Sequence, residues 1–507
     1  MSPKDAQVAQ ERRAAPLDLP PERFRALGHA LVDRIAEHLA ALPRGPVTPG
    51  ETMTDVRRTL GGGDLPESGI DPGHLIGETA ELLFRHSLYN GHPRFFGYIT
   101  SSAAPIGALG DLLAAAVNPN VSSFSLAPMA TEIERQTLRW IAELIRYPTD
   151  ADGLLVSGGN MANFVCFLAA RRARAAWNVR AEGLGGPGRR LRVYASSETH
   201  TWIQKACDLF GLGTNALHEI PVDRELRMEV AALGQAVRED RARGEVPFLV
   251  VGTAGSVGTG AVDPLREIAE VCRAEDLWFH ADGAYGALAA AMADAPPDLH
   301  ALALADSVAV DPHKWLYAPL EAGCALVRRP GALIDTFSYR PPYYHFPEGA
   351  DPPVNFYERG PQNSRGFRAL KVWLGLRQAG RAGYAAMMAD DVRLTRRLYD
   401  LAAAHPRLEA FTCGLSIATF RYVPEGIRRD DPAATEYLNR LNTELLTRMQ
   451  NSGRAYPSNA VIRGAFVLRA CIVNFRTQAE DVEALPEITV EIGDAVHKEM
   501  RATAPKA

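Results

Sequence analysis

The stretch from about residue 154 to residue 327 constrains the fold most, because short apolar runs alternate there with amphipathic helical patterns. The apolar runs predict strands at 192–195, 248–251, 277–279 and 307–310. The amphipathic patterns predict helices at 201–210, 228–242 and 264–274. Such alternation is typical of a mostly parallel sheet covered by helices. With 507 residues the chain is too long for one simple core, so we expect two or three subdomains.

Polar side chains lie within a few positions of the carboxyl ends of these strands, namely His200, Thr253, Asp282 and Lys314. In open α/β sheets, ligands bind at this edge. Taken alone, Lys314 fits an ordinary surface lysine better than a reactive one. Asp282 changes that interpretation, because a carboxylate can keep a pyridine nitrogen protonated while a lysine forms a Schiff base. Pyridoxal phosphate requires this pair of groups.

A phosphate site is predicted at Ser157-Gly158-Gly159-Asn160, which comes directly before a long apolar helix. The free N–H groups of a first helical turn, together with the helix dipole, favour a bound phosphate. Two adjacent glycines are also common in tight turns. Gly159 and Asn160 are the phosphate-binding candidates, because the segment resembles the phosphate loop of a family that other segments of this chain also resemble.

The composition predicts a cytoplasmic protein whose ligand is a small molecule. A net charge of −5 gives no reason to expect nucleic acid or a membrane as partner. The longest apolar runs fall short of the ~18 residues of a membrane span, and the N-terminal residues lack the apolar centre of a signal peptide. The six cysteines are scattered, with no CxxC and no His/Cys cluster, so we expect reduced thiols and no metal site.

Three separated segments carry a resemblance to a known family: HPRFFGY at 92–98, TEIE at 131–134 and SRGFRALKVW at 364–373. With these segments in this order, the chain resembles the group II pyridoxal-phosphate-dependent amino-acid decarboxylases, the family that contains the aromatic-L-amino-acid decarboxylases. The likeness extends from about residue 20 to residue 479.

The resemblance implies the α/β fold of a PLP-dependent transferase of fold type I, with a mostly parallel seven-stranded sheet. It implies an N-terminal helical segment (1–90) swapped between the subunits of a homodimer, a large PLP-binding α/β domain (91–378) and a small C-terminal α+β domain (379–507). The sequence after Pro20 has the apolar spacing of a helix, with a stripe of Phe24, Leu27, Leu31, Ile35, Leu39 and Leu42. The stripe is expected to pack on the partner subunit; packing on its own domain is the alternative.

The implied reaction is decarboxylation of an L-amino acid, aromatic or related, to the amine and CO2 through a Lys314 aldimine and a quinonoid. His200 matches the family histidine that stacks on the coenzyme ring, and an imidazole there can also transfer a proton. Ala284 is expected to lie under the ring, and Thr253 near it. His313 is expected to contact the phosphate, to shuttle a proton or to position Lys314.

The proton donor at the substrate Cα depends on a one-residue alignment. Residues 338–361 predict a long loop, and counting back without gaps from the FRALK segment puts Phe356 at the position of a catalytic family tyrosine, with Tyr357 next to it. Loss of a positioned acid slows proton transfer by ~10²–10⁴-fold. Phenylalanine there is typical of relatives that form aldehydes by decarboxylation and oxidative deamination. His200 favours the amine-forming decarboxylase.

The substrate pocket is predicted to contain Tyr98, Ile99, Thr100 and Phe124, which is consistent with an aromatic amino acid. Phe95 and Phe96 fit either the pocket or the core. The segment 118–123 is more polar than its counterpart in aromatic decarboxylases, so aliphatic and basic amino acids stay open.

Two further classes of protein are disfavoured. A non-catalytic coenzyme-binding scaffold would be expected to lose one of Lys314, Asp282 and His200, and all three are present. A transaminase or aldolase on the same fold is disfavoured by the segments at 92–98 and 364–373.

Overall fold

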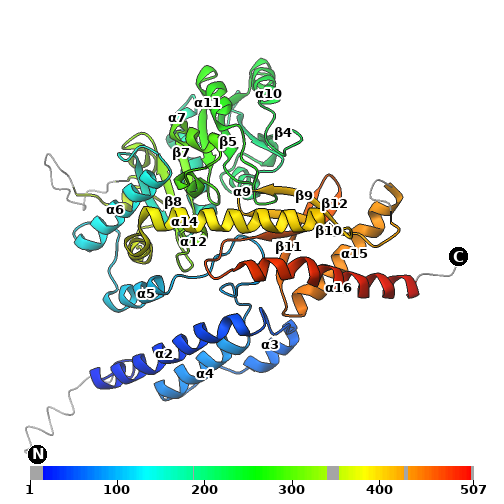
Figure 1. Ribbon diagram of the computed structural model, residues 1–507. Helices are drawn as coiled ribbons and strands as arrows, with labels where there is room; N and C mark the ends of the chain where they lie inside the picture. The colour runs from blue at the N-terminus through cyan, green and yellow to red at the C-terminus, as the bar shows by residue number, and fades with distance from the viewer. Residues whose placement is uncertain (1–14, 187, 340–352, 428–431, 504–507) are drawn as a thin grey trace, which may run out of the picture. The chain divides into compact units, whose positions relative to one another are not determined.

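Two units make up the part of the chain that a computed structural model describes, which comprises residues 15–186, 188–339, 353–427 and 432–503 (Figure 1). The smaller unit contains the residues before Asn90 together with Asn451–Gly453, and the larger unit contains the others. None of the helices in these ranges combines the length and the apolar character needed to cross a bilayer.

Helices make up most of the smaller unit: α2 (Pro21–Ala41), the 3₁₀ turn η1 (Leu42–Arg44), α3 (Met53–Leu60) and α4 (Pro72–Arg85). Proline at the first position begins α2 and α4 without loss of a helical hydrogen bond. The Asp71 carboxylate caps α4 by accepting hydrogen bonds from two first-turn N–H groups, at 2.8 and 3.3 Å. Ion pairs Arg23–Asp71 and Arg34–Glu81 join α2 to α4.

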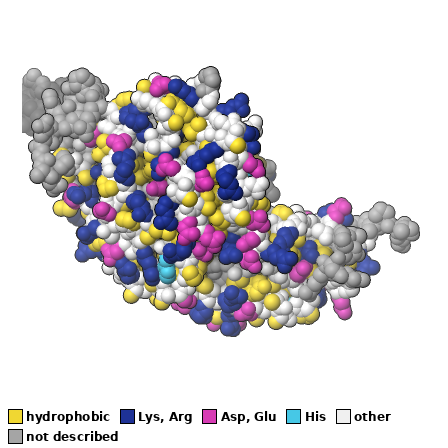
Figure 2. Space-filling view, turned by 90° about the horizontal axis from the view of Figure 1, so that it is seen from above, with side chains coloured by type: hydrophobic (Ala, Val, Ile, Leu, Met, Phe, Trp, Pro, Cys, Tyr) yellow, Lys and Arg dark blue, Asp and Glu magenta, His cyan; other side chains and the backbone are white. Residues whose placement is uncertain are grey.

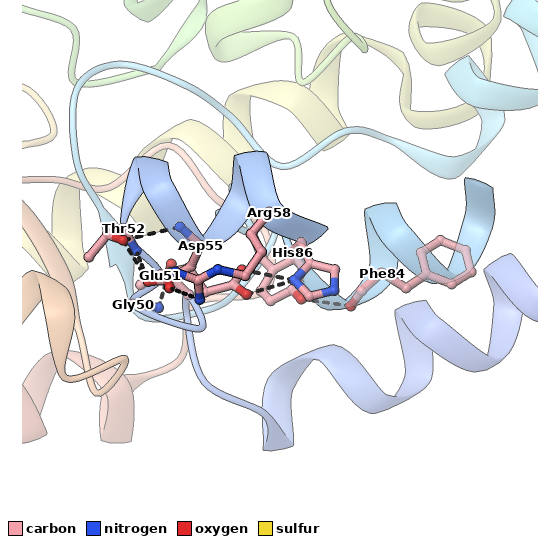
Figure 3. A network of polar contacts seen from close by, with 9 residues as sticks. Gly50, Glu51, Thr52, Asp55, Arg58, Phe84 and His86 are labelled. Carbon is pink, nitrogen blue, oxygen red and sulfur yellow. Dashed lines mark hydrogen bonds and ion pairs between the residues drawn. The ribbon is translucent and has the colours of Figure 1, made fainter. Parts of the chain in front are cut away.

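A capping box begins α3 (Figure 3). Thr52 Oγ1 accepts a hydrogen bond from the N–H of Asp55 at 3.2 Å, and Asp55 Oδ2 accepts one from the N–H of Thr52 at 3.1 Å. Beside the box, His86 Nδ1 lies 2.8 Å from Glu51 Oε1. These contacts tie the start of α3 to the residue that follows α4.

The predicted apolar stripe of α2 is largely exposed on the single chain. No residue of α2 is buried, and Phe24 and Ile35 are 58% and 37% exposed. Of the six stripe residues, Leu42 alone is buried, just after the helix ends. Leu27, Leu31 and Leu39 are half-buried, so packing on the partner subunit and packing on its own domain both stay predictions.

The large sheet of the second unit has seven strands in the order β2-β8-β7-β6-β5-β3-β4. Its strands are β2 (Asp152–Val156), β3 (Leu191–Ser196), β4 (Leu217–Ile220), β5 (Val246–Thr253), β6 (Trp278–Asp282), β7 (Ser307–Val310) and β8 (Gly323–Val327). The five strands β7, β6, β5, β3 and β4 are parallel to one another. Strand β8 runs antiparallel to both of its neighbours, β2 and β7. The predicted α/β fold with a mostly parallel seven-stranded sheet is confirmed.

Helices cover this sheet and bury its apolar strands. Those in contact with strands are α7 (Gly159–Arg174), α9 (Trp202–Leu209), α10 (Val230–Ala242), α11 (Leu265–Ala274) and α13 (Ala332–Phe337). Short helices lie in the connections: α8 (Val179–Glu182), α12 (Pro312–Trp315), η2 (Thr214–Ala216), η3 (Ala287–Ala291), η4 (Pro297–Leu304) and η5 (Phe356–Glu358). The helices predicted at 201–210, 228–242 and 264–274 are confirmed within about two residues.

A second sheet has the order β1-β11-β12-β10-β9. Its strands are β1 (Phe95–Phe96), β9 (Leu408–Gly414), β10 (Ile417–Tyr422), β11 (Tyr456–Ile462) and β12 (Ala465–Cys471). Helices α15 (Pro432–Asn451) and α16 (Ala479–Thr503) belong to the same part of the chain. This arrangement matches the expected small α+β portion.

Helix α14 (Ala369–Ala404) is the long yellow helix of Figure 1. It contacts two strands of the second sheet, β9 and β10, and three helices: α5 (Pro105–Val117), α6 (Pro128–Leu144) and α16. Gly380 interrupts it with a φ of 65°, a conformation that glycine adopts without strain. The boundary predicted at residue 378 falls inside this helix, so the division into 91–378 and 379–507 stays a prediction.

Two of the family-like segments meet in the interior. Glu134 of TEIE and Arg365 of SRGFRALKVW form a buried ion pair with Nη2–Oε1 and Nη1–Oε2 distances of 2.5 and 3.2 Å. Glu134 also accepts a hydrogen bond from the N–H of Leu155 at 2.9 Å. These segments therefore join α6, β2 and the residues before α14.

The surface carries both charges. On the face drawn in Figure 2, Lys and Arg side chains are interspersed with Asp and Glu side chains.

Candidate active site

A cavity of about 850 Å³ lies among residues of the larger unit and has the volume of a typical cofactor site. Most of the predicted site residues line it: Tyr98, Ile99, Thr100, Gly159, Asn160, His200, Thr253, Asp282, Ala284, His313 and Lys314. They come from segments far apart in the sequence, so the fold gathers them.

The parallel strands explain this gathering. Thr253 and Asp282 are the last residues of β5 and β6, and they are direct partners in the ladder between these strands. His200 follows β3, and Lys314 lies in α12 after β7. Because all four strands run the same way, their carboxyl ends meet at one edge of the sheet.

Asp282 is buried and held on both carboxylate oxygens. The indole N–H of Trp202 donates to Oδ2 at 2.7 Å, and the N–H of Ala284 donates to Oδ1 at 3.2 Å. Behind them, Trp202 packs edge-on against His280 with ring centroids 5.7 Å apart. Burial lowers the pKa of His280 to about 4, so its ring is neutral near pH 7. Neutral groups thus surround the fixed carboxylate.

His200 presents an open imidazole to the cavity. Its Nδ1 accepts a hydrogen bond from the N–H of Trp202 at 3.3 Å, which leaves Nε2 to carry the proton of the neutral ring. Burial lowers the pKa of His200, while the nearby Asp282 opposes that shift. The imidazole is therefore neutral near pH 7.

Thr253 is fixed by two contacts. Its N–H donates to Asp263 Oδ2 at 2.8 Å, and its hydroxyl lies 3.2 Å from the hydroxyl of Thr199. Burial raises the pKa of Asp263 to about 6.

Lys314 lines the cavity, and its Nζ lies 2.9 Å from Asp311 Oδ2. The neighbouring His313 accepts a hydrogen bond at Nδ1 from the N–H of Ala322 at 3.1 Å. Burial lowers the pKa of His313, and Asp311 opposes that shift.

The glycines before α7 leave a cradle at the start of a 16-residue helix. A Cβ on Gly159 would lie 2.6 Å from Asp311 Oδ2 and 3.1 Å from Ala284 Cβ, and a Cβ on Gly158 would lie 3.2 Å from His313 Cε1. Only residues without a side chain leave this space open. The first N–H groups of a helix lack intrahelical partners, so a phosphate fits here.

The residues present fit pyridoxal phosphate. A lysine amine, a fixed carboxylate, an open imidazole and a helix N-terminus line one cavity, which matches the needs of an aldehyde, a pyridine nitrogen, an aromatic face and a phosphate. The described residues include no group of three or more His, Cys, Asp and Glu side chains arranged to hold a metal ion.

Three predicted site residues do not line this cavity. Phe356 is fully buried, with its ring 4.7 Å from the guanidinium carbon of Arg365. The N–H of Tyr357 donates to the carbonyl of Ser122 at 3.1 Å. Phe124 is also absent from the cavity wall. Residues 340–352 of the predicted loop lie outside the described residues.

Phe95 and Phe96 belong to the core rather than to the cavity. Both are buried in β1, which pairs with β11. Phe95 stacks on Tyr456 with ring centroids 5.6 Å apart.

Sequence reasoning missed Arg469 of β12, a buried residue of the cavity wall. Its Nε and Nη1 donate to the carbonyls of Val257 (2.7 Å) and Tyr98 (2.8 Å). Its buried Nη2 finds no acceptor among the described residues. An arginine inside the apolar run AFVLRAC is a usable signal, because buried arginines normally have partners.

Comparison with known proteins gives one family. The model of the pyridoxal-dependent decarboxylase conserved domain matches residues 63–423. An aromatic-L-amino-acid decarboxylase of Bacillus atrophaeus is 33% identical over 469 residues, which cover 92% of this chain and 94% of the relative. A 4-hydroxyphenylacetaldehyde synthase of Rhodiola rosea is 28% identical and covers 92% and 94% of the two chains.

A similar solved structure is that of Oryza sativa TDC with PLP and tryptamine. Its TM-score is 0.87 at 26% identity, and the match covers 96% of this chain and all of the other.

Proposed function

Because the chain belongs to the pyridoxal-dependent decarboxylase family, we propose that it decarboxylates an aromatic L-amino acid to the amine and CO2. The chain is a pyridoxal-phosphate-dependent carboxy-lyase. The observation that carries the proposal is the joint presence of Lys314, Asp282 and His200 in one cavity. The aromatic substrate rests on the named relatives.

Each cavity residue has a proposed role toward the coenzyme. The Lys314 amine attaches the aldehyde, Asp282 pairs with the pyridine nitrogen, and His200 stacks on the ring. Gly159 and Asn160 at the start of α7 hold the phosphate, and the remaining contacts come from Thr253, Ala284 and His313. When bound, pyridoxal phosphate supplies a sink for the electron pair that stays at Cα when CO2 leaves.

His200 is suited to proton transfer at the substrate Cα. Its ring is neutral near pH 7 because burial lowers its pKa, and its Nδ1 is occupied by the N–H of Trp202. A proton on Nε2 is therefore the one that the ring can give and take back. Phe356 and Tyr357 do not line the cavity of their own chain. Any role of theirs in this proton transfer therefore lies outside that cavity.

The substrate pocket is proposed to include Tyr98, Ile99 and Thr100, which line the same cavity as Lys314. Arg469 adds a positive charge to the cavity wall beside Tyr98, and this charge favours a substrate carboxylate in that part of the cavity.

We also propose a cytoplasmic homodimer. Exposed apolar side chains on α5 support it, since Leu109, Leu112, Leu113 and Val117 are each more than half exposed. Phe24 and Ile35 of the α2 stripe are exposed, which fits the expected exchange of residues 1–90. The cysteines are all free and mostly buried, which fits a reducing compartment.

Product analysis tests the activity. Purified protein with bound coenzyme is incubated with a panel of aromatic, aliphatic and basic L-amino acids. CO2 and amine are expected from the aromatic members, without hydrogen peroxide or ammonia. Peroxide and ammonia in step with CO2 would assign the chain to the aldehyde-forming class, and turnover of basic substrates alone would contradict the substrate proposal.

Borohydride trapping tests the attachment site. The wild-type chain is expected to yield a coenzyme adduct on the peptide that contains Lys314, and Lys314→Ala is expected to yield none. A full adduct in Lys314→Ala would contradict this site.

A further inference from the structure

Asp311 is the first residue before α12, yet its side chain does not cap that helix. An aspartate at this position normally accepts a hydrogen bond from a first-turn N–H group. Here the N–H of Lys314 donates to the backbone carbonyl of Asp311 instead, at 2.9 Å. The carboxylate is therefore available for another partner.

That partner is the lysine side chain. Asp311 Oδ2 lies 2.9 Å from Lys314 Nζ, and the Asp311 side chain is only 2% exposed. Little water can compete for the carboxylate, so the ion pair is only weakly screened. The other oxygen, Oδ1, is buried and receives no hydrogen bond from the described residues.

His313 adds to this arrangement. Its Nδ1 is occupied by the N–H of Ala322. The proton of the neutral ring therefore lies on Nε2, which is 3.7 Å from Asp311 Oδ2. Asp311 thus faces two donors of its own short helix, and Lys314 is the nearer.

We propose that the Asp311 carboxylate pairs with Nζ of Lys314 whenever Nζ is not bonded to the coenzyme, and that this ion pair stabilises the displaced lysine, so that an incoming amine displaces it more easily. The proposal rests on the proposed attachment of the coenzyme to Lys314. The Asp311 carboxylate then assists the exchange of lysine for substrate amine, a role that is not proposed for Asp282 or His200.

The exchange balances without an outside acid or base. The substrate nitrogen enters as an ammonium and loses three hydrogens in all when it forms its C=N bond to the coenzyme carbon. Nζ gains three hydrogens when its own C=N bond to that carbon breaks. One C=N bond replaces another, no electrons change hands, and Nζ ends as an ammonium beside the Asp311 carboxylate.

Other titratable and charged groups line the same cavity, and they limit what Asp311 can do. These are His313 on α12, Asp282 at the end of β6, Glu198 and His200 after β3, Glu321 before β8 and Arg469 on β12. Asp282 is already held by Trp202 and Ala284. Only Asp311 is within ion-pair distance of Nζ among the described residues.

The test measures exchange rather than turnover. Holoenzyme is titrated with methylamine at pH 7, treated with borohydride, and scored for the coenzyme-labelled Lys314 peptide by mass spectrometry. Loss of a hydrogen bond between two charged groups changes an equilibrium constant by a factor of about 10. Asp311→Asn is therefore expected to need about ten-fold more methylamine for half displacement, and the difference should narrow as the pH rises toward that at which free lysine is neutral.

Asp335→Asn is the matched control, because it removes an exposed carboxylate that pairs with Arg329. It is expected to keep the wild-type midpoint. Asp311→Ser serves as a second variant with less bulk, in case Asn disturbs the close contact with Gly159. Wild-type midpoints in the Asp311 variants, or a shift that does not change with pH, would overturn the inference. Absence of the labelled peptide in the wild type would instead contradict the attachment site.

Discussion

The orientation of the Asp282 carboxylate is fixed by a residue that is far from it in the sequence. Trp202 begins α9, eighty residues before Asp282, and its indole N–H donates to Oδ2 at 2.7 Å. Trp202 is itself fully buried and packs against His280. The indole therefore positions the carboxylate that is proposed to pair with the pyridine nitrogen.

Trp202→Phe is expected to weaken coenzyme binding. The change keeps an aromatic ring and removes a hydrogen bond to a charged group, a contact that contributes about 1.5–3 kcal/mol. The dissociation constant of pyridoxal phosphate should rise by about ten-fold or more, measured by absorbance titration of the refilled protein. Trp177→Phe, which removes an exposed indole bond to the Gly183 carbonyl, should leave it unchanged. Equal constants in the two variants would show that Trp202 has no positioning role.

Glu134→Gln is expected to lower the free energy of unfolding by about 3–5 kcal/mol, because it leaves the buried Arg365 guanidinium without its counter-charge. Denaturant unfolding measures the loss. Glu132→Gln on the same helix breaks the exposed pair with Arg135 and should cost less than about 1 kcal/mol. Similar losses in both variants would contradict the importance of burial for this pair.

At residue level, the strand ends and the family resemblance together pointed to Lys314, Asp282, His200 and Thr253. One cavity contains all four residues, and their roles toward the coenzyme stay predictions. Trp202 and Asp311 have roles that depend on side-chain direction, which a single sequence does not encode locally. Phe356 was assigned by counting residues through a loop. Such a count gives an alignment position but does not show whether the side chain is buried.

Helix α14 supports the turn that carries Lys314. Its residue Asp391 accepts hydrogen bonds from the Trp315 indole at 2.8 Å and from the Tyr317 hydroxyl at 2.7 Å. Burial raises the pKa of Asp391 to about 7, although these two hydrogen bonds oppose the shift. A buried carboxyl group with a raised pKa thus holds Trp315 and Tyr317, which lie one and three residues after Lys314.

Asp391→Asn is expected to change how stability depends on pH. A raised native pKa means that the group stabilises the fold below its unfolded value near 4 and loses that contribution as the pH rises to about 7. The unfolding free energy of Asp391→Asn should therefore rise relative to the wild type between pH 4 and pH 7, by up to about 4 kcal/mol. Thermal or denaturant unfolding across this range measures it. A pH-independent difference would contradict the buried titration.

Element-level prediction depended on strand length and polarity. The strands β3, β5, β6 and β7 were expected because their residues form continuous apolar runs. The edge strand β4 was missed because it has only four residues, of which His218 and Glu219 are polar. Strand β1 has only two residues and is defined by its pairing with β11, so no local sequence pattern predicts it.

The assembly of two chains is tested on α5. Leu113→Asp puts a charge on the exposed apolar face of this helix, where burial in a partner would make it costly. Light scattering should give twice the mass of one chain for the wild type and a single-chain mass for the variant. Leu209→Asp on α9, at an isolated exposed leucine, should keep the dimer. A wild-type protein that is monomeric and active would contradict the proposal.

The cavity wall combines the ends of parallel strands from one sheet with Arg469 and Ser458 from the other. A folding intermediate with only one sheet complete would lack part of this wall. Uptake of vitamin B6 coenzyme should therefore report that both sheets have formed and docked. Since a ligand that binds only the native state stabilises it in proportion to its supply, cells short of the vitamin would hold less intact protein as well as less loaded enzyme.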